Sequence, residues 1–99
     1  KVKLAFKNTG KLPKVAMGHN IGILKNSVDL IEFCNEAVKF PTNEYFPKGR
    51  EKDVIVRTKL LGPGETDTVY FMAPESGTYE FVCTFPGHFA LMKGKMIVK

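Results

Sequence analysis

The stretch CTFPGHFALM, residues 83–92 of this 99-residue chain, carries three side chains that bind soft or borderline metal ions. These are the thiol of Cys83, the imidazole of His88 and the thioether of Met92, with four and then three residues between them. Such short spacings allow one tight loop to direct all three groups at one point. With a second imidazole, they would make the ligand set of an electron-transfer copper site. The rest of the chain is therefore expected to hold this loop rigidly.

Short segments of alternating or β-branched residues surround this stretch. In residues 79–83 the aromatic positions alternate with others, so that Cys83 is expected at the end of a strand. Glycine and proline turns separate the segments, as in Gly62–Gly64 and Pro74–Gly77. The expected strands are residues 2–6, one or two short strands within 16–24, then 54–61, 68–72, 79–83 and 95–99.

Residues 27–39 change to a period of three or four. The helical spacing consists of Val28, Ile31, Cys34 or Asn35, and Val38, with Asn26 or Ser27 as the expected N-cap. A polar loop is expected over residues 40–52. The pattern predicts an all-β fold, a Greek-key β-sandwich with one short helix inserted in a flap, formed by a single domain of residues 1–99.

Composition narrows the classes of function. Fifteen Lys and Arg against ten Asp and Glu give a net charge of +5, which favours partners with acidic surfaces. No nucleic-acid motif accompanies this charge, and no apolar run approaches the ~18 residues of a membrane span. The chain has two histidines and two cysteines. A second copper centre of the kind used by copper enzymes would have no imidazoles, and we do not expect a disulfide, which would consume Cys83.

His19 is the candidate for the second imidazole. It lies between Gly18 and Asn20, and glycine beside such a histidine indicates close backbone approach. Taken alone, each candidate ligand is more often a core or turn residue. Together they match the needs of copper, since imidazole suits both oxidation states whereas thiolate and thioether favour Cu(I). Asn20 is expected to hydrogen-bond the neighbouring loop and so orient the ligands.

These motifs resemble the azurins, blue copper proteins of the cupredoxin family. The resemblance covers nearly the whole chain and rests on residues 83–88 and 90–94, LPK at 12–14, MGHN at 17–20, TKL at 58–60 and GxGE at 62–65. It implies one copper ion with His19, Cys83 and His88 as equatorial ligands. Met92 would be the weak axial ligand, and the Gly18 carbonyl would approach from the opposite side. Asn20, Thr84 and Phe85 would surround the ligands.

The resemblance also implies a function. Copper would cycle between Cu(II) and Cu(I), and electrons would pass through the exposed edge of His88 to redox partners such as c-type cytochromes or copper- or haem-containing reductases and oxidases. A periplasmic or otherwise exported location is expected. The apolar docking patch around His88 would consist of Leu12, Met17, Phe85, Pro86, Gly87, Phe89, Ala90 and Leu91.

The chain departs from the azurin pattern in several places. Azurins usually have an additional N-terminal strand stapled by a disulfide, so this sandwich is either one strand short or belongs to a longer polypeptide. Phe89 replaces a small residue, and Asn8 stands where many azurins have a titrating histidine. Cys34 is expected to be a buried thiol in the helix.

Two other functions stay open at this point. A copper carrier or chaperone needs exposed and exchangeable ligands, whereas Cys83 ends a strand among aromatic residues. A metal-free β-sandwich interaction module would not depend on Cys83. A nucleophilic enzyme is not expected, because no acidic residue forms an orienting motif with Cys83 and a histidine.

Overall fold

The computed structural model describes all residues from 1 to 99 as six strands, two α-helices and two short 3-10 helices. Its elements, in chain order, are β1 (Val2–Lys7), α1 (Lys14–Met17), β2 (Gly22–Leu24), α2 (Leu30–Ala37), the 3-10 helices η1 (Pro41–Asn43) and η2 (Glu51–Asp53), β3 (Val54–Arg57), β4 (Thr66–Phe71), β5 (Gly77–Val82) and β6 (Lys93–Val98).

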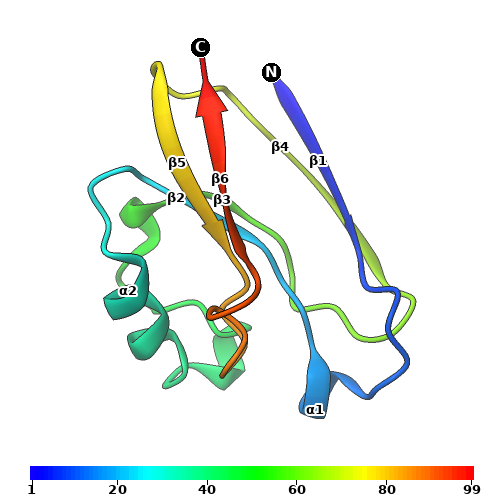
Figure 1. Cartoon of the computed structure of the whole chain (residues 1–99). Coiled ribbons are helices and arrows are strands. Elements are labelled where there is room, and N and C mark those ends of the chain that lie inside the picture. The colour runs from blue at the N-terminus through cyan, green and yellow to red at the C-terminus, as the bar shows by residue number, and fades with distance from the viewer.

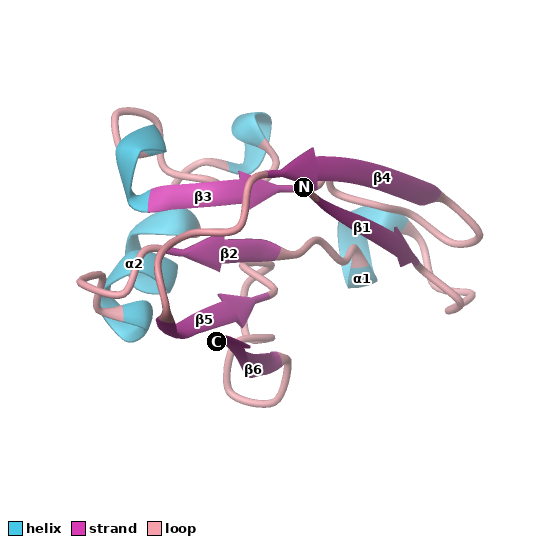
Figure 2. Ribbon diagram, turned by 90° about the horizontal axis from the view of Figure 1, so that it is seen from above, coloured by secondary structure: helices cyan, strands magenta, loops and turns pink.

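The strands form two antiparallel sheets. One sheet pairs β1 with β4, and the other has the order β3-β2-β5-β6. Figure 1 shows α2 on one side of the four-stranded sheet and the β1–β4 pair on the other. Viewed from above, β3 of one sheet lies next to β4 of the other (Figure 2). The expectation of a Greek-key β-sandwich with a helix is confirmed.

Strand β2 of the four-stranded sheet is buried on both faces. Successive residues of a strand point to opposite faces, and β2 shows this with two neighbours. Ile23 joins Phe71 and Tyr79 in the core between the sheets. Leu24 joins the core beneath α2, with Phe33 among its neighbours. Because β2 and β5 lie between two cores, the loop that follows β5 starts from a firmly packed strand.

Helix α2 lies within the predicted segment, but its start and its buried face differ from the prediction. The side chain of Asp29, and not that of Asn26 or Ser27, caps the helix by accepting hydrogen bonds from the backbone N–H groups of Ile31 and Glu32. The buried face consists of Leu30, Phe33, Cys34 and Ala37, whereas Ile31 and Val38 are exposed. Of the positions used for the prediction, Cys34 lies on this buried face, whereas Ile31 and Val38 face solvent, so the predicted face was shifted.

Two further predictions were wrong in detail. Residues 14–17 form the single helical turn α1 instead of a strand, so that His19 follows a helix and joins the sheet region through a bridge to Leu61. The strand predicted for residues 54–61 ends at Arg57. The loop of residues 40–52 contains the 3-10 helices η1 and η2. Four-residue helical turns are too short to show a period in the sequence.

Strands β1 and β6 each pair on one side only. Between them lies a hollow of about 270 Å³, whose lining includes Val2, Leu4, Phe81 and Met96. Lysines stand on both strands, which is a common way to discourage pairing at an open sheet edge. None of the helices has the length and apolar character needed to cross a membrane.

The N-cap of α2 provides a test of the fold. Replacing Asp29 with Ala should lower the free energy of unfolding by ~1 kcal/mol, because two N–H groups lose their acceptor. Chemical denaturation of the metal-free protein measures this loss. Asp29→Asn should retain most of the stability, and Ser27→Ala should leave it unchanged. A larger loss for Ser27→Ala than for Asp29→Ala would contradict the assignment.

Candidate metal centre

The loop between β5 and β6 holds three of the predicted ligands. Cys83 directly follows β5, and its N–H donates to the Met92 carbonyl at 2.9 Å, which closes the loop. The Met92 N–H in turn donates to the His88 carbonyl at 2.8 Å. Gly87 has a φ of 83°, a left-handed conformation in which glycine is strongly favoured. The sharp turn at Gly87 brings His88 back towards Cys83.

His19 reaches the same place from the other end of the chain. Its N–H donates to the Leu61 carbonyl at 3.1 Å, and its carbonyl accepts from the Leu61 N–H at 2.7 Å. A Cβ on the preceding Gly18 would lie 2.8 Å from the Lys14 carbonyl and 3.1 Å from Leu60. The close backbone approach predicted at Gly18 is therefore confirmed, and α1 packs directly against the ligand segment.

The side chains of His19, Cys83 and His88 converge. Their ligand atoms all lie within 4.8 Å of one another, and Cys83 Sγ is 3.5 Å from His88 Nδ1. The two imidazole ring centroids are 4.9 Å apart. His19 Nδ1 is buried without a hydrogen-bond partner. A buried unpaired nitrogen facing a thiol and a second imidazole is the environment that a bound metal ion would satisfy.

Burial sets the electrostatics of the group. It raises the pKa of the Cys83 thiol, although the backbone N–H groups of Asn20 and Phe85 act in the opposite direction. Burial, with a smaller contribution from His19, lowers the pKa of His88. A neutral imidazole is the form that binds metal, and a thiol that must ionise on binding releases a proton. The site therefore suits a metal ion, which would compensate for the buried thiolate.

Asn20 and Thr84 connect the two ligand segments, as the sequence led us to expect for Asn20. The Asn20 side chain accepts from the Thr84 N–H at 2.8 Å and donates to Thr84 Oγ1 at 2.9 Å. Both residues are almost completely buried. Two hydrogen bonds thus join the residue after His19 to the residue after Cys83.

Phe85 does not belong to the exposed surface. Only 7% of it is accessible, and its ring lies 4.7 Å from that of His88 and 5.1 Å from that of Tyr45, measured between centroids. Its place in the predicted docking patch was wrong, because the ring turns inward and supports His88 from behind. Its predicted position next to the metal ligands agrees with these contacts.

Most of the other residues predicted for the patch around His88 are accessible to solvent. Leu12, Met17 and Leu91 are exposed, with Leu91 at 91%. Pro86, Gly87 and Ala90 are also exposed, whereas His88 and Phe89 are half-buried and Phe89 packs against the core beneath α2. Val15, which was not among the predicted residues, is also 90% exposed, on α1 between Leu12 and Met17. Its position between two predicted members was the available signal.

Met92 and Gly18 complete the predicted ligand set. Met92 is half-buried and lines a hollow together with Cys83. Gly18 is buried directly before His19. Their ligand roles remain predictions.

Comparisons with known proteins agree with this geometry. Residues 2–99 match the model of the copper-binding proteins of the plastocyanin/azurin family. An azurin of Alcaligenes faecalis is 43% identical over 92 residues, which cover 90% of this chain and 71% of the relative. An azurin of Pseudomonas aeruginosa is 40% identical over 93 residues, covering 91% of this chain and 62% of the relative. The reduced auracyanin of Roseiflexus castenholzii superposes with a TM-score of 0.86 at 39% identity, covering 99% of this chain and 76% of that one.

The fold and the site thus define a blue copper protein that transfers electrons. The chain belongs to the plastocyanin/azurin family, which confirms the resemblance seen in the sequence. The group formed by His19, Cys83 and His88 can hold one copper ion.

Both cysteines are free, as expected, and Cys34 lies in the core beneath α2. Burial, with smaller effects of Cys83 and Glu80, raises the pKa of the Cys34 thiol from 9.0 to about 12. The folded pKa is thus above the unfolded one. The stability that this neutral thiol contributes is present below pH 9 and is lost as the pH rises towards 12.

This shift predicts a pH-dependent difference between two proteins. The free energy of unfolding of the metal-free wild type, minus that of Cys34→Ala, should fall above pH 9 by at most ~1.4 kcal/mol per pH unit. Urea denaturation at pH 8, 9 and 10 measures it. Subtracting the variant removes the titration of lysines common to both proteins. A difference that stays constant from pH 8 to 10 would show that Cys34 ionises normally.

Proposed function

We propose that His19, Cys83 and His88 would hold the copper ion, with Met92 and the Gly18 carbonyl as weaker ligands. The unpaired Nδ1 of His19 is the single observation that carries this proposal. When bound, copper supplies a one-electron Cu(II)/Cu(I) couple. The chain's own residues keep the ligand atoms together, exclude water and provide the route to the surface.

The route to the surface is the ring of His88. Its Nδ1 faces Cys83, its ring packs on that of Phe85, and it is only half-buried. The apolar docking patch of Leu12, Val15, Met17, Pro86, Gly87, Ala90 and Leu91, with the half-buried Phe89, surrounds it. An apolar surface of this kind suits brief docking, since electron transfer partners must separate quickly and form small interfaces.

Charge supports a partner with an acidic rim. Lys11 and Lys14 are exposed on the segment that carries Leu12 and Val15. Electrostatic attraction would increase the rate of encounter without requiring a tight complex. Redox proteins such as c-type cytochromes, or copper- and haem-containing reductases and oxidases, are the partners that fit. We further propose that residues 1–99 form one domain that carries electrons without catalysing a reaction of its own, and that the protein is periplasmic or otherwise exported.

A copper carrier is less well supported. Cys83 is 2% exposed, and its backbone N–H is engaged with Met92. Ligands enclosed in this way exchange metal slowly. A chelator of moderate strength should therefore remove copper over hours, and rapid loss would favour the carrier.

The copper site is tested by metal addition. One equivalent of Cu(II) added to the purified protein should produce an intense blue absorption from the thiolate-to-copper transition. Cys83→Ser should abolish the colour because the hydroxyl cannot replace the soft thiolate. Cys34→Ser serves as the control and should stay blue. A wild-type protein that binds copper stoichiometrically without colour would refute the proposal.

The docking patch is tested by a charge placed in it. Leu91→Asp should lower the second-order rate of electron transfer with a c-type cytochrome by about tenfold, because a desolvated carboxylate opposes docking. The visible spectrum should not change. Ile97→Asp is the matched control, since Ile97 is exposed and is the last residue but one of β6. The C-terminal end of β6 lies at the opposite end of the strand from the loop between β5 and β6 (Figure 1). Equal slowing by both variants would rule out this patch, and stopped-flow spectroscopy provides the rates.

A further inference from the structure

The turn that follows η1 contains two consecutive residues in a left-handed conformation. Glu44 has a φ of 58° and Tyr45 a φ of 61°, and neither is glycine. Residues other than glycine adopt this conformation reluctantly, and two in succession require surrounding contacts to hold them. The contacts of this turn therefore indicate what it does.

The backbone of the turn binds both ligand segments. The Glu44 carbonyl accepts from Asn20 Nδ2 at 3.0 Å, and the Tyr45 carbonyl accepts from the hydroxyl of Thr84. Asn20 and Thr84 are the two residues that join the His19 segment to the Cys83 segment. The left-handed turn is thus the third member of that junction, and it satisfies buried donors on both sides.

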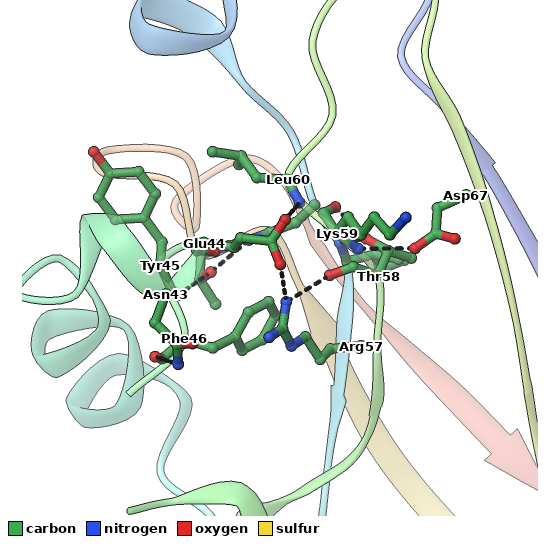
Figure 3. Close-up of polar contacts among 12 residues, drawn as sticks. Asn43, Glu44, Tyr45, Phe46, Arg57, Thr58, Lys59, Leu60 and Asp67 are labelled. Carbon is green, nitrogen blue, oxygen red and sulfur yellow. Dashed lines mark hydrogen bonds and ion pairs between the residues drawn. The ribbon is translucent and has the colours of Figure 1, made fainter. Parts of the chain in front are cut away.

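The side chain of Glu44 extends the junction in another direction. One carboxylate oxygen accepts from Arg57 Nη1 at 2.7 Å, and the other accepts from the Leu60 N–H at 3.0 Å. Figure 3 shows the carboxylate between Arg57 and Leu60, with Thr58 on the same segment. The two oxygens therefore hold the end of β3 and the chain that leaves it.

Leu60 connects this contact to the upstream ligand. Its side chain packs 3.1 Å from the place where a Cβ on Gly18 would lie. The next residue, Leu61, forms the two backbone hydrogen bonds that hold His19. The Glu44 carboxylate thus fixes the position of Gly18 and His19 through Leu60. The Glu44 backbone carbonyl fixes the side chain of Asn20.

We propose that Glu44 is a positioning residue of the copper site. It holds the turn of residues 44–45 against both ligand segments. The inference rests on the proposed ligand set. The Glu44 and Arg57 side chains are 38% and 33% exposed. An ion pair exposed to this degree contributes little stability and would not by itself position the ligand segments. What distinguishes Glu44 from such a pair is that its carboxylate also accepts from the Leu60 N–H and its backbone carbonyl accepts from the Asn20 amide.

The test separates the carboxylate from the backbone. Glu44→Gly removes both side-chain contacts but still permits a φ of 58°. Glu44→Gln keeps an oxygen for the Leu60 N–H and loses the charge opposite Arg57. Glu32→Gln is the matched control. Glu32 lies on α2 and pairs with Arg50, and none of its hydrogen bonds reaches a ligand segment.

The first measurement uses the metal-free protein. In Glu44→Gly, amide hydrogen exchange at Leu60 and Thr84 should accelerate about tenfold, the effect of one lost net hydrogen bond. Rates are compared with those of the β5 amides paired to β6, which report global stability. Glu44→Gln should accelerate exchange less. If Thr84 exchanges no faster than in Glu32→Gln, Glu44 acts only locally and the proposal fails.

The second measurement uses the copper-loaded protein. Glu44→Gly should change the ratio of the visible absorption bands and speed copper removal by a chelator about tenfold, the effect of losing the hydrogen bond to Leu60. Glu32→Gln should match the wild type in both. An unchanged spectrum together with an unchanged removal rate would overturn the role of Glu44. A wild-type protein that is not blue would instead refute the ligand set, and the exchange result would still decide whether Glu44 holds the two segments.

Discussion

The hydrogen bonds between Asn20 and Thr84 are the contact on which the site depends. They join positions 64 residues apart, and each adjoins a metal-binding residue. His19 and Cys83 have no connection through local structure, since one follows a helical turn and the other a strand. Leaving a buried polar group without a hydrogen-bond partner is costly in free energy. The Asn20–Thr84 pair is therefore fixed only when the two segments meet in the correct register, and the same register brings the ligand atoms together.

Much of the fold could be predicted because its signals repeat. Alternating apolar and polar residues marked the strands. Because the chain has only two histidines, both were identified as candidate metal ligands. Features that depend on a single turn or a single side chain were lost. Asn26, Ser27 and Asp29 are all residue types that cap helices well, and the folded chain uses the last of them. Likewise α1 has too few residues to display a period.

The site was predictable in its chemistry more than in its surroundings. Ligand types at short spacing identify the loop of residues 83–92, because few combinations of thiol, imidazole and thioether suit another metal. The inward turn of Phe85 had no signal, since a loop has no regular alternation of faces. The positioning role of Glu44 depends on contacts with Asn20 and Leu60, which are distant in sequence. Sequence patterns report local preferences, and long-range hydrogen bonds leave no such trace.

The exposed Val15 and Leu91 have a consequence for the behaviour of the protein in concentrated solution. Two copies could cover these side chains by placing the same faces together. Each copy carries a net charge of +5, so approach is opposed by mutual repulsion at the ionic strength where that charge is not screened. The excess of positive charge thus opposes self-association through the exposed apolar side chains. The same net charge that repels a second copy would attract a partner with an acidic surface.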